Sequence, residues 1–187
     1  MALWVGAVGL GQVAFSRYNN TPAKSLAPAR SWPRGTSLNR SRSGPTLVMA
    51  AHPQCPCTRA TLTELEHILA SSPGQLQSRI LFVLPPGYAP SWAYSATWKQ
   101  AGALPGVTCS LDRGGAEARR FHLSTSGQTE IFDQNGNLVF NGGLTVSRGE
   151  TGDNPAEASV ESLLRTGKAT LASSPVFGCA LFSSTIQ

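Results

Sequence analysis

Two cysteines separated by one proline are the part of this sequence best suited to chemistry. Cys55 and Cys57 follow the short apolar run 46–51 and precede a run of residues with helical spacing. Thiols at the start of a helix face unpaired backbone N–H groups and the positive end of the helix dipole, and both favour the thiolate. We therefore predict that Cys55 and Cys57 form a nucleophilic site. His52, on the same loop, can supply an imidazole as a proton partner or a metal ligand.

The elements that must position these cysteines alternate between strands and helices. The expected strands cover 46–51, 80–84, 107–111, 129–132 and 138–140, and the expected helices cover 58–70, 92–101, 115–123 and 154–167. An Asn-Gly pair at 135–136, between the last two strands, indicates a hairpin. Because parallel units come first and a hairpin comes last, this order predicts an α/β fold in which helices flank a central mixed sheet.

The composition divides the chain into three parts. Residues 1–18 contain the uncharged apolar run Ala2–Phe15, which at about 14 residues is shorter than the roughly 20 that span a bilayer. We predict that residues 1–18 are a signal peptide or membrane-anchor segment. Residues 19–44 are rich in Ser, Pro and Arg without a hydrophobic period, which predicts a basic flexible linker. Residues 45–187 are then the folded domain.

The net charge of +5 does not belong to the predicted domain. Residues 1–44 hold six basic and no acidic side chains, whereas residues 45–187 hold nine basic and ten acidic ones, a balance of −1. A basic groove on the domain is therefore not expected, which argues against a nucleic-acid partner. We expect contact with a membrane through the N-terminal segment instead. The even number of cysteines, four, fits a periplasmic or other extracytoplasmic location.

The order of elements, with the cysteines after the first strand, resembles the thioredoxin fold. The segment 51–60 is similar to that of the RedB-type thioredoxin-like proteins of bacteria. Further short segments carry the same resemblance, namely 125–127, 142–145, 147–149, 152–154 and 175–179. The resemblance covers roughly residues 45–182 and implies a thioredoxin-like fold.

The sequence departs from ordinary thioredoxins at two places. Thioredoxins have two residues between their cysteines, whereas Cys55 and Cys57 have one. A disulfide in so small a ring has demanding geometry and is expected to be comparatively oxidising. Counted back from the Asn-Gly turn, Gln128 stands where thioredoxins keep a cis-proline. The groove that binds a substrate's backbone is therefore expected to be reshaped.

The leading functional hypothesis is thiol–disulfide exchange without a cofactor. Cys55, the first cysteine after the strand, is the expected nucleophile, and Cys57 is expected to resolve the mixed disulfide. The partner is a protein or a small molecule that carries a thiol or disulfide. The sequence leaves the redox donor and the direction of transfer open.

Three alternatives remain at this stage. His52, Cys55 and Cys57 form a soft ligand set suited to copper delivery, to which the distant His122 can add. A peroxide-reducing role would use Cys55 with Thr58 and with Arg59 or Arg148 to stabilise the transferred oxygen. The third alternative is a structural domain without turnover.

The other two cysteines receive separate predictions. Cys109 falls within an expected strand, so a buried and inert thiol is predicted. Cys179 can pair with Cys109, act as a resolving thiol, or remain free and partly buried. The long polar loop 142–154, which contains Arg148, either lines the cysteine site or is an ordinary solvent loop.

Overall fold

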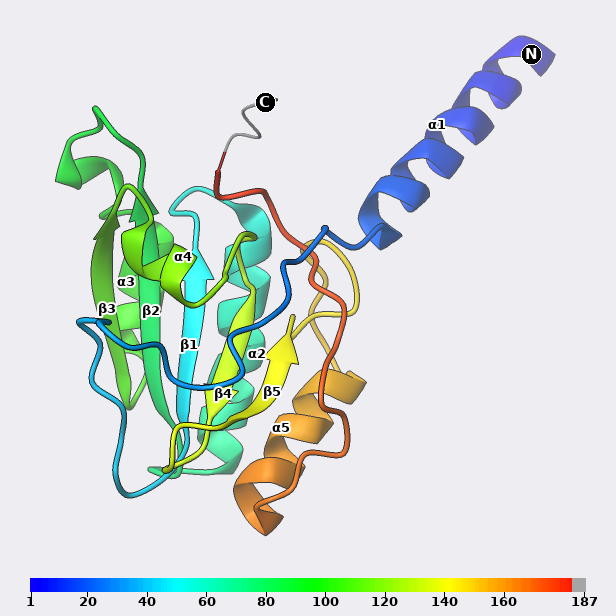
Figure 1. Cartoon of the computed structure of the whole chain (residues 1–187). Helices are drawn as coiled ribbons and strands as arrows, with labels where there is room; N and C mark the ends of the chain where they lie inside the picture. The colour runs from blue at the N-terminus through cyan, green and yellow to red at the C-terminus, as the bar shows by residue number, and fades with distance from the viewer. Residues whose placement is uncertain (183–187) are drawn as a thin grey trace.

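A five-stranded mixed sheet forms the centre of the protein (Figure 1). The computed structural model describes residues 1–182, so residues 183–187 of the predicted domain lie outside the described residues. In spatial order the strands are β3 (Val107–Arg113), β2 (Gln77–Leu84), β1 (Thr46–Ala51), β4 (Thr129–Phe132) and β5 (Leu138–Gly142). β1, β2 and β3 are parallel to one another. β4 runs antiparallel to β1, and β5 pairs antiparallel with β4 as the predicted hairpin. The predicted α/β class with a mixed sheet is confirmed.

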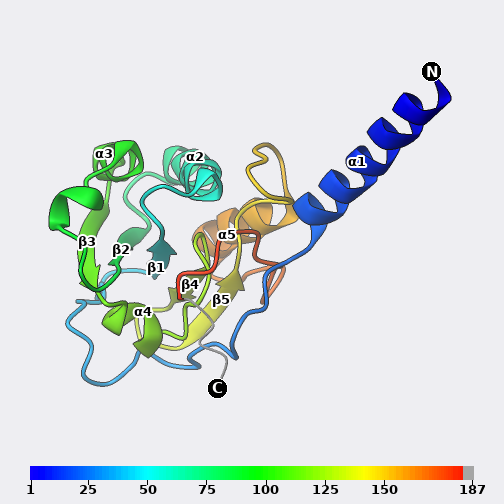
Figure 2. The same ribbon diagram turned by 90° about the horizontal axis from the view of Figure 1, so that it is seen from above.

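Helices cover both faces of the sheet (Figure 2). The helices of the domain are α2 (Pro56–Ser71), α3 (Ala96–Ala103), α4 (Ala116–Arg120) and α5 (Pro155–Thr166). The side chains of α2, α3 and α5 pack on one face around Leu47, Met49 and Phe82. α4 and part of the N-terminal segment pack on the other face around Phe121 and Phe132. β1, the strand that precedes the cysteines, is therefore buried along its whole length between two apolar layers.

Three helices differ from the predicted ranges. The helix predicted over 115–123 is the shorter α4. The other two differ because of their caps. The helix after the cysteines begins at Pro56 rather than at residue 58, since proline is favourable at the first helical position. The helix predicted over 92–101 is split into a 3-10 turn, Pro90–Trp92, and α3. Ser95 caps α3 by accepting a hydrogen bond from the N–H of Trp98. The pair Asn154-Pro155 predicts an N-cap followed by a proline at the first helical position, and α5 confirms both.

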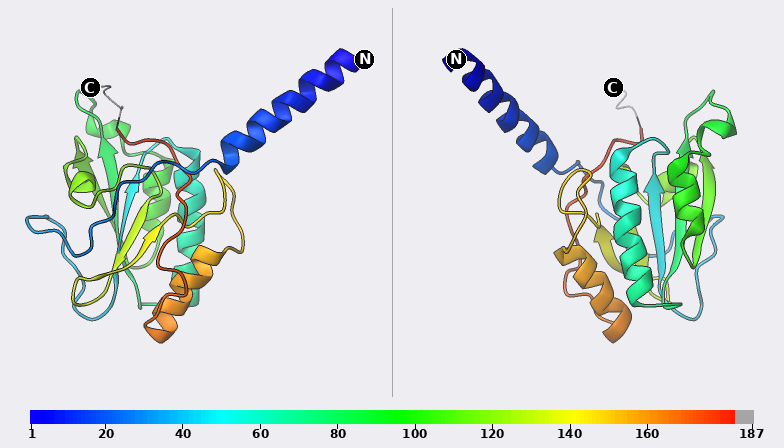
Figure 3. Two further views of the ribbon diagram at one scale, coloured as in Figure 1. Left: turned by 45° about the vertical axis from the view of Figure 1, so that its right-hand side comes forward. Right: turned by 180° about the vertical axis from the view of Figure 1, so that it is seen from behind.

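The segment 21–44, which follows the first helix, lies along the domain (Figure 3). The sequence predicts a flexible linker over 19–44, but Trp32 packs edge-on against Phe121 and Phe132 at ring distances of 5.1 and 5.3 Å. The N–H of Trp32 also donates to the carbonyl of Gly136 in the β4–β5 turn at 2.7 Å. The linker prediction overlooked these contacts because a single tryptophan gives no periodic signal, although it buries a large apolar surface.

The first helix, α1 (Ala2–Asn20), projects away from the domain (Figure 1). Several large apolar side chains of α1 are exposed, among them Trp4, Leu10 and Phe15. Within residues 1–182, no helix is both long enough and apolar enough to cross a membrane.

Candidate functional site

The predicted cysteines lie where β1 ends and α2 begins. Cys55 occupies the N-cap of α2 with an extended backbone, and Cys57 lies in the first helical turn. Pro56 between them takes the first helical position, where a backbone N–H has no partner within the helix, so the proline costs no hydrogen bond. The two residues are only 2% and 6% exposed. The site is therefore covered, and what covers it decides which molecules can reach the sulfurs.

A third cysteine, Cys179, lies directly beside Cys55. Their Sγ atoms are 2.8 Å apart, although 124 positions separate the two residues in the sequence. This distance is much shorter than an ordinary contact between two sulfurs and longer than the roughly 2.05 Å of a disulfide bond. The sequence allows three roles for Cys179, and the structure places it in the cysteine site.

The extended segment 178–181, the C-terminal strand, brings Cys179 to this place through a single β-bridge. Thr125 and Ala180 form an antiparallel bridge. The N–H of Ser126 donates to the carbonyl of Cys179 at 2.8 Å, and the N–H of Leu181 donates to that of Ser124 at 2.9 Å. The segment 178–181 thus pairs with the loop 124–126 and crosses the cysteine end of the sheet.

The surroundings of Cys55 favour its thiolate. Its pKa is lowered to about 4, first by a hydrogen bond from the Cys57 thiol and then by hydrogen bonds from the Cys179 thiol and from backbone N–H groups, against the opposing effect of burial. The other two thiols, Cys57 and Cys179, have raised pKa values. The pKa of Cys57 is raised far above its usual range by the hydrogen bond to Cys55 and by burial, and burial raises the pKa of Cys179 to about 11. One thiolate between two thiols is the resulting charge state.

Ser126 ties together the segments that surround the thiols. Its hydroxyl accepts a hydrogen bond from the N–H of His52 at 2.8 Å and lies 2.5 Å from the hydroxyl of Thr58. Thr58 in turn donates to the carbonyl of His52 at 3.1 Å. Thr58, a predicted supporting residue, therefore holds the cysteine loop. Ser126 was not predicted as a site residue, although it lies in one of the segments that carry the family resemblance.

We predict that Ser126→Ala lowers the free energy of unfolding by about 1–2 kcal/mol, because the N–H of His52 loses its acceptor. Urea denaturation followed by circular dichroism measures the change. Ser25→Ala, at an exposed position of the N-terminal segment, is the matched control and is expected to change nothing measurable. Equal stability of the two variants would show that the Ser126 hydroxyl does not hold the loop.

Arg148 reaches the cysteine site from the loop 142–154. Its guanidinium donates to the carbonyl of Gly178, the residue before Cys179, at 2.5 Å, and to the carbonyl of Tyr18 at 3.1 Å. Its positive charge favours the thiolate of Cys57 and of Cys179. The loop therefore lines the site, and Arg148 holds the C-terminal segment against it.

Three other predicted supporting residues have different roles. The Nδ1 atom of His52 accepts from the N–H of Gln54 at 3.2 Å, and its ring packs edge-on against Trp92. Arg59 is exposed on α2 and lines a pocket of about 330 Å³ beside the loop 149–151. Gln128 is buried and accepts through Oε1 from the N–H groups of residues 124 and 125, so it shapes the loop that pairs with the C-terminal segment. Gln128 stands where thioredoxins keep a cis-proline, but no peptide bond within residues 1–182 is cis.

His52 does not join Cys55 and Cys57 in a cluster of three ligands. Among the described residues, the cluster of three side chains that could hold a metal is Glu64, His67 and Glu157, rather than His52 with the two cysteines. The more distant His122 is held by a contact of 2.7 Å between its Nδ1 atom and the carbonyl of Ala27.

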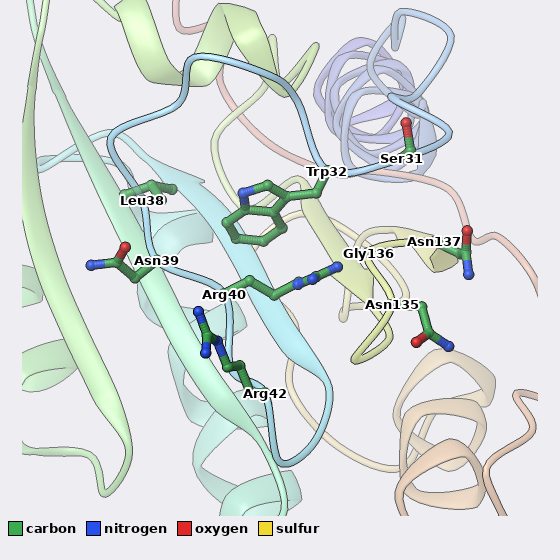
Figure 4. Close-up of a pocket in the computed structure, with 9 residues that line it drawn as sticks. All are labelled: Ser31, Trp32, Leu38, Asn39, Arg40, Arg42, Asn135, Gly136 and Asn137. Atoms are coloured by element: carbon green, nitrogen blue, oxygen red, sulfur yellow. The ribbon is translucent and has the colours of Figure 1, made fainter.

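Cys109 and the pocket shown in Figure 4 lie apart from the thiol site. Cys109 is on β3 and packs against the main core, and burial raises its pKa to about 11.

The pocket in Figure 4 has a volume of about 670 Å³ and lies between Arg40, Trp32 and the β4–β5 turn. That turn follows Phe132, which pairs with Thr46 at the start of β1, so this pocket is at the opposite end of the sheet from Cys55.

Comparison with known proteins gives the class of the fold. No family model and no curated protein matches the chain. A hypothetical protein from Sinorhizobium meliloti matches over 86% of this chain and 97% of its own, with 15% identity and a TM-score of 0.64. An uncharacterized conserved protein from Geobacillus kaustophilus matches over 87% and 92%, with 16% identity and a TM-score of 0.58.

A thioredoxin-like superfamily protein, SPOA0173, also matches over 77% of this chain and 96% of its own, with 14% identity and a TM-score of 0.49. The five-stranded mixed sheet, with flanking helices and with the cysteines after its central strand β1, has the arrangement of the thioredoxin-like fold. At these identities the likeness establishes the fold, and the activity has to be argued from the site.

Proposed function

We propose that this protein carries out thiol–disulfide exchange, with Cys55 as the nucleophile. The observation that carries the proposal is the placement of the Cys55 sulfur at a helix N-cap, 2.8 Å from the sulfur of Cys179. The pKa of about 4 makes Cys55 a thiolate at neutral pH, and the thiolate is the form that attacks disulfides.

The exchange proceeds in two displacements. The Cys55 thiolate attacks one sulfur of a partner's disulfide, so that a mixed disulfide forms and the other sulfur leaves as a thiolate. A second thiol of this chain then attacks the Cys55 sulfur and releases the partner's remaining sulfur. The partner gains two electrons, and this chain ends with an internal disulfide. Reduction by an external dithiol, protein or small molecule, closes the cycle.

The test combines a titration with an exchange reaction. We expect the ultraviolet absorbance of the reduced protein to show one thiolate that titrates with a pKa of about 4, and we expect this signal to be lost in Cys55→Ser. The reduced protein should form disulfides with oxidised glutathione, which mass spectrometry detects, whereas Cys55→Ser should not react. Cys109→Ser, which removes a thiol outside the site, is the matched control and should behave as the wild type. A fully reactive Cys55→Ser protein would contradict the proposal.

The proposal includes a RedB-type relationship and an extracytoplasmic location. The Cys-Pro-Cys motif and the segments around residues 126, 148 and 178 support a RedB-type relationship, since the contacts described above join these segments at one site. The exposed apolar side chains of α1 support export or membrane attachment, with the domain in an extracytoplasmic compartment. Fractionation of cells that make the full chain tests this location. The copper alternative has no support from the positions of His52, Cys55 and Cys57.

A further inference from the structure

Cys179 lies in the place from which a thiol can attack the Cys55 sulfur. We infer that Cys179, carried by the C-terminal strand 178–181, is the resolving thiol, and that Cys57 is a hydrogen-bond donor that positions and stabilises the Cys55 thiolate. The inference rests on the proposed thiol–disulfide exchange and names the second thiol of that reaction. It replaces the expectation that Cys57 resolves the mixed disulfide.

Hydrogen bonds along the C-terminal strand hold Cys179 in this position. The backbone of Cys179 is fixed by the N–H of Ser126, and Arg148 holds the carbonyl of Gly178. Upstream, the N–H of Ser174 donates to the carbonyl of Asn141, and the N–H of Gly143 donates to that of Pro175. The strand is thus attached to β5 and to the loop 124–126 on either side of the sulfur.

Glycines let this strand approach closely. A side chain on Gly178 would place its Cβ within 1.9 Å of the carbonyl oxygen of Ser126. A Cβ on Gly143 would lie 2.7 Å from the carbonyl oxygen of Pro175. Both contacts are too short for real atoms, so the path that delivers Cys179 depends on the absence of these side chains.

The strand also explains why the nucleophile is covered. The pairing of 124–126 with 178–181 is a β-bridge of the kind that an extended peptide forms at a sheet edge. Cys179 thus occupies, from within the chain, the place beside Cys55 that a cysteine of a partner peptide would take. The strand therefore has to shift when the partner's disulfide enters, and it returns to bring Cys179 to the mixed disulfide.

The resolving step exchanges the mixed disulfide for a disulfide within the chain. The Cys179 thiol loses its proton and its sulfur attacks Sγ of Cys55 in the mixed disulfide. The bond between Cys55 and the partner's sulfur breaks, and the partner's sulfur leaves and takes up a proton. The new bond joins Cys55 and Cys179. Burial, the hydrogen bond to the Cys55 thiolate and the charge of that thiolate together raise the pKa of Cys179 to about 11, and Arg148 opposes them. The two contributions of Cys55 vanish once its sulfur is part of the mixed disulfide.

The test is to map disulfides in the full chain after equilibration with reduced and oxidised glutathione. We expect a Cys55–Cys179 disulfide in the wild type and in Cys57→Ser. In Cys179→Ser, which keeps Cys55, we expect the mixed disulfide of Cys55 with glutathione to accumulate about tenfold or more, because the thiol held beside it is gone. Cys109→Ser is the matched control and should show the wild-type pattern.

The two proposals fail in different ways. A Cys55–Cys57 disulfide with Cys179 open to alkylation would overturn the inference about Cys179 and leave the proposed exchange standing. The absence of any disulfide or glutathione adduct at Cys55, in the wild type and in all variants, would overturn the proposed function itself. Circular dichroism of each variant establishes that it is folded.

Discussion

Glu130→Gln is expected to make the protein more stable at neutral pH and to remove a large part of the pH dependence of its stability. Glu130 lies on β4 opposite Val48 and is fully buried. Its Oε1 atom accepts from the N–H of Ala29 at 3.3 Å, and its Oε2 atom has no hydrogen-bond partner among residues 1–182. Burial raises the pKa of this carboxyl to about 8.

The sign of the effect follows from the two pKa values. Below the ordinary carboxyl pKa of 4.5, the folded and unfolded chains both hold the proton, and Glu130 has no influence. As the pH rises toward 8, only the unfolded chain releases the proton, so the free energy of unfolding falls by on the order of 3 kcal/mol between pH 5 and pH 8. Glutamine does not ionise, so the variant lacks this decrease.

Urea denaturation of both proteins at several pH values measures this effect. The difference between the variant and the wild type isolates Glu130 from other titrating groups, such as Glu157, whose pKa burial raises to about 7. Glu66→Gln, on the exposed side of α2, is the matched control and should give a difference near zero at every pH. A constant difference between Glu130→Gln and the wild type from pH 5 to pH 8 would show that Glu130 ionises normally in the folded protein.

Local sequence signals predicted the elements of the fold well because those signals act over short distances. The buried strand before Cys55, the Asn-Gly turn and the Asn154 cap each depend on a few neighbouring residues. The position of Cys55 at the start of a helix followed from the same kind of signal. The N-terminal segment was misjudged because Trp32 and Ala29 gain their burial from distant partners, which no local pattern reveals.

The site was predicted only in part, for the same physical reason. Cys55, Cys57 and Thr58 are neighbours in the chain, so their proximity could be inferred. The contact between Cys55 and Cys179 depends on the route of the last residues across the sheet, a route built from contacts of the loops 124–127 and 142–148. The glycines at 142, 143 and 178 were the available signal. Each stands where a side chain would collide with another segment, so together they indicated close approach of backbones.

Gly178→Ala should therefore uncouple Cys179 from Cys55 while both cysteines are kept. The added Cβ would lie 1.9 Å from the carbonyl oxygen of Ser126, and backbone atoms cannot yield as the end of a flexible side chain can. The strand has to move outward, which breaks the hydrogen bond from Ser126 to Cys179. A misplacement of about 1 Å can reduce the rate of an intramolecular reaction by about 10²-fold, so the Cys55–Cys179 disulfide should form about that much more slowly.

Rapid quenching with an alkylating agent after addition of oxidised glutathione, followed by mass spectrometry, gives the rate of disulfide formation in each protein. Gly102→Ala is the matched control, since its Cβ meets no atom within 4 Å and alanine suits the interior of α3. The initial attack of Cys55 on glutathione should not be slowed in Gly178→Ala, because the strand that covers the sulfur is displaced. Slow closure together with an unhindered first step would show that the resolving thiol is displaced. A general loss of folding would instead give Gly178→Ala a thiolate titration and a circular dichroism spectrum that differ from those of the Gly102→Ala control.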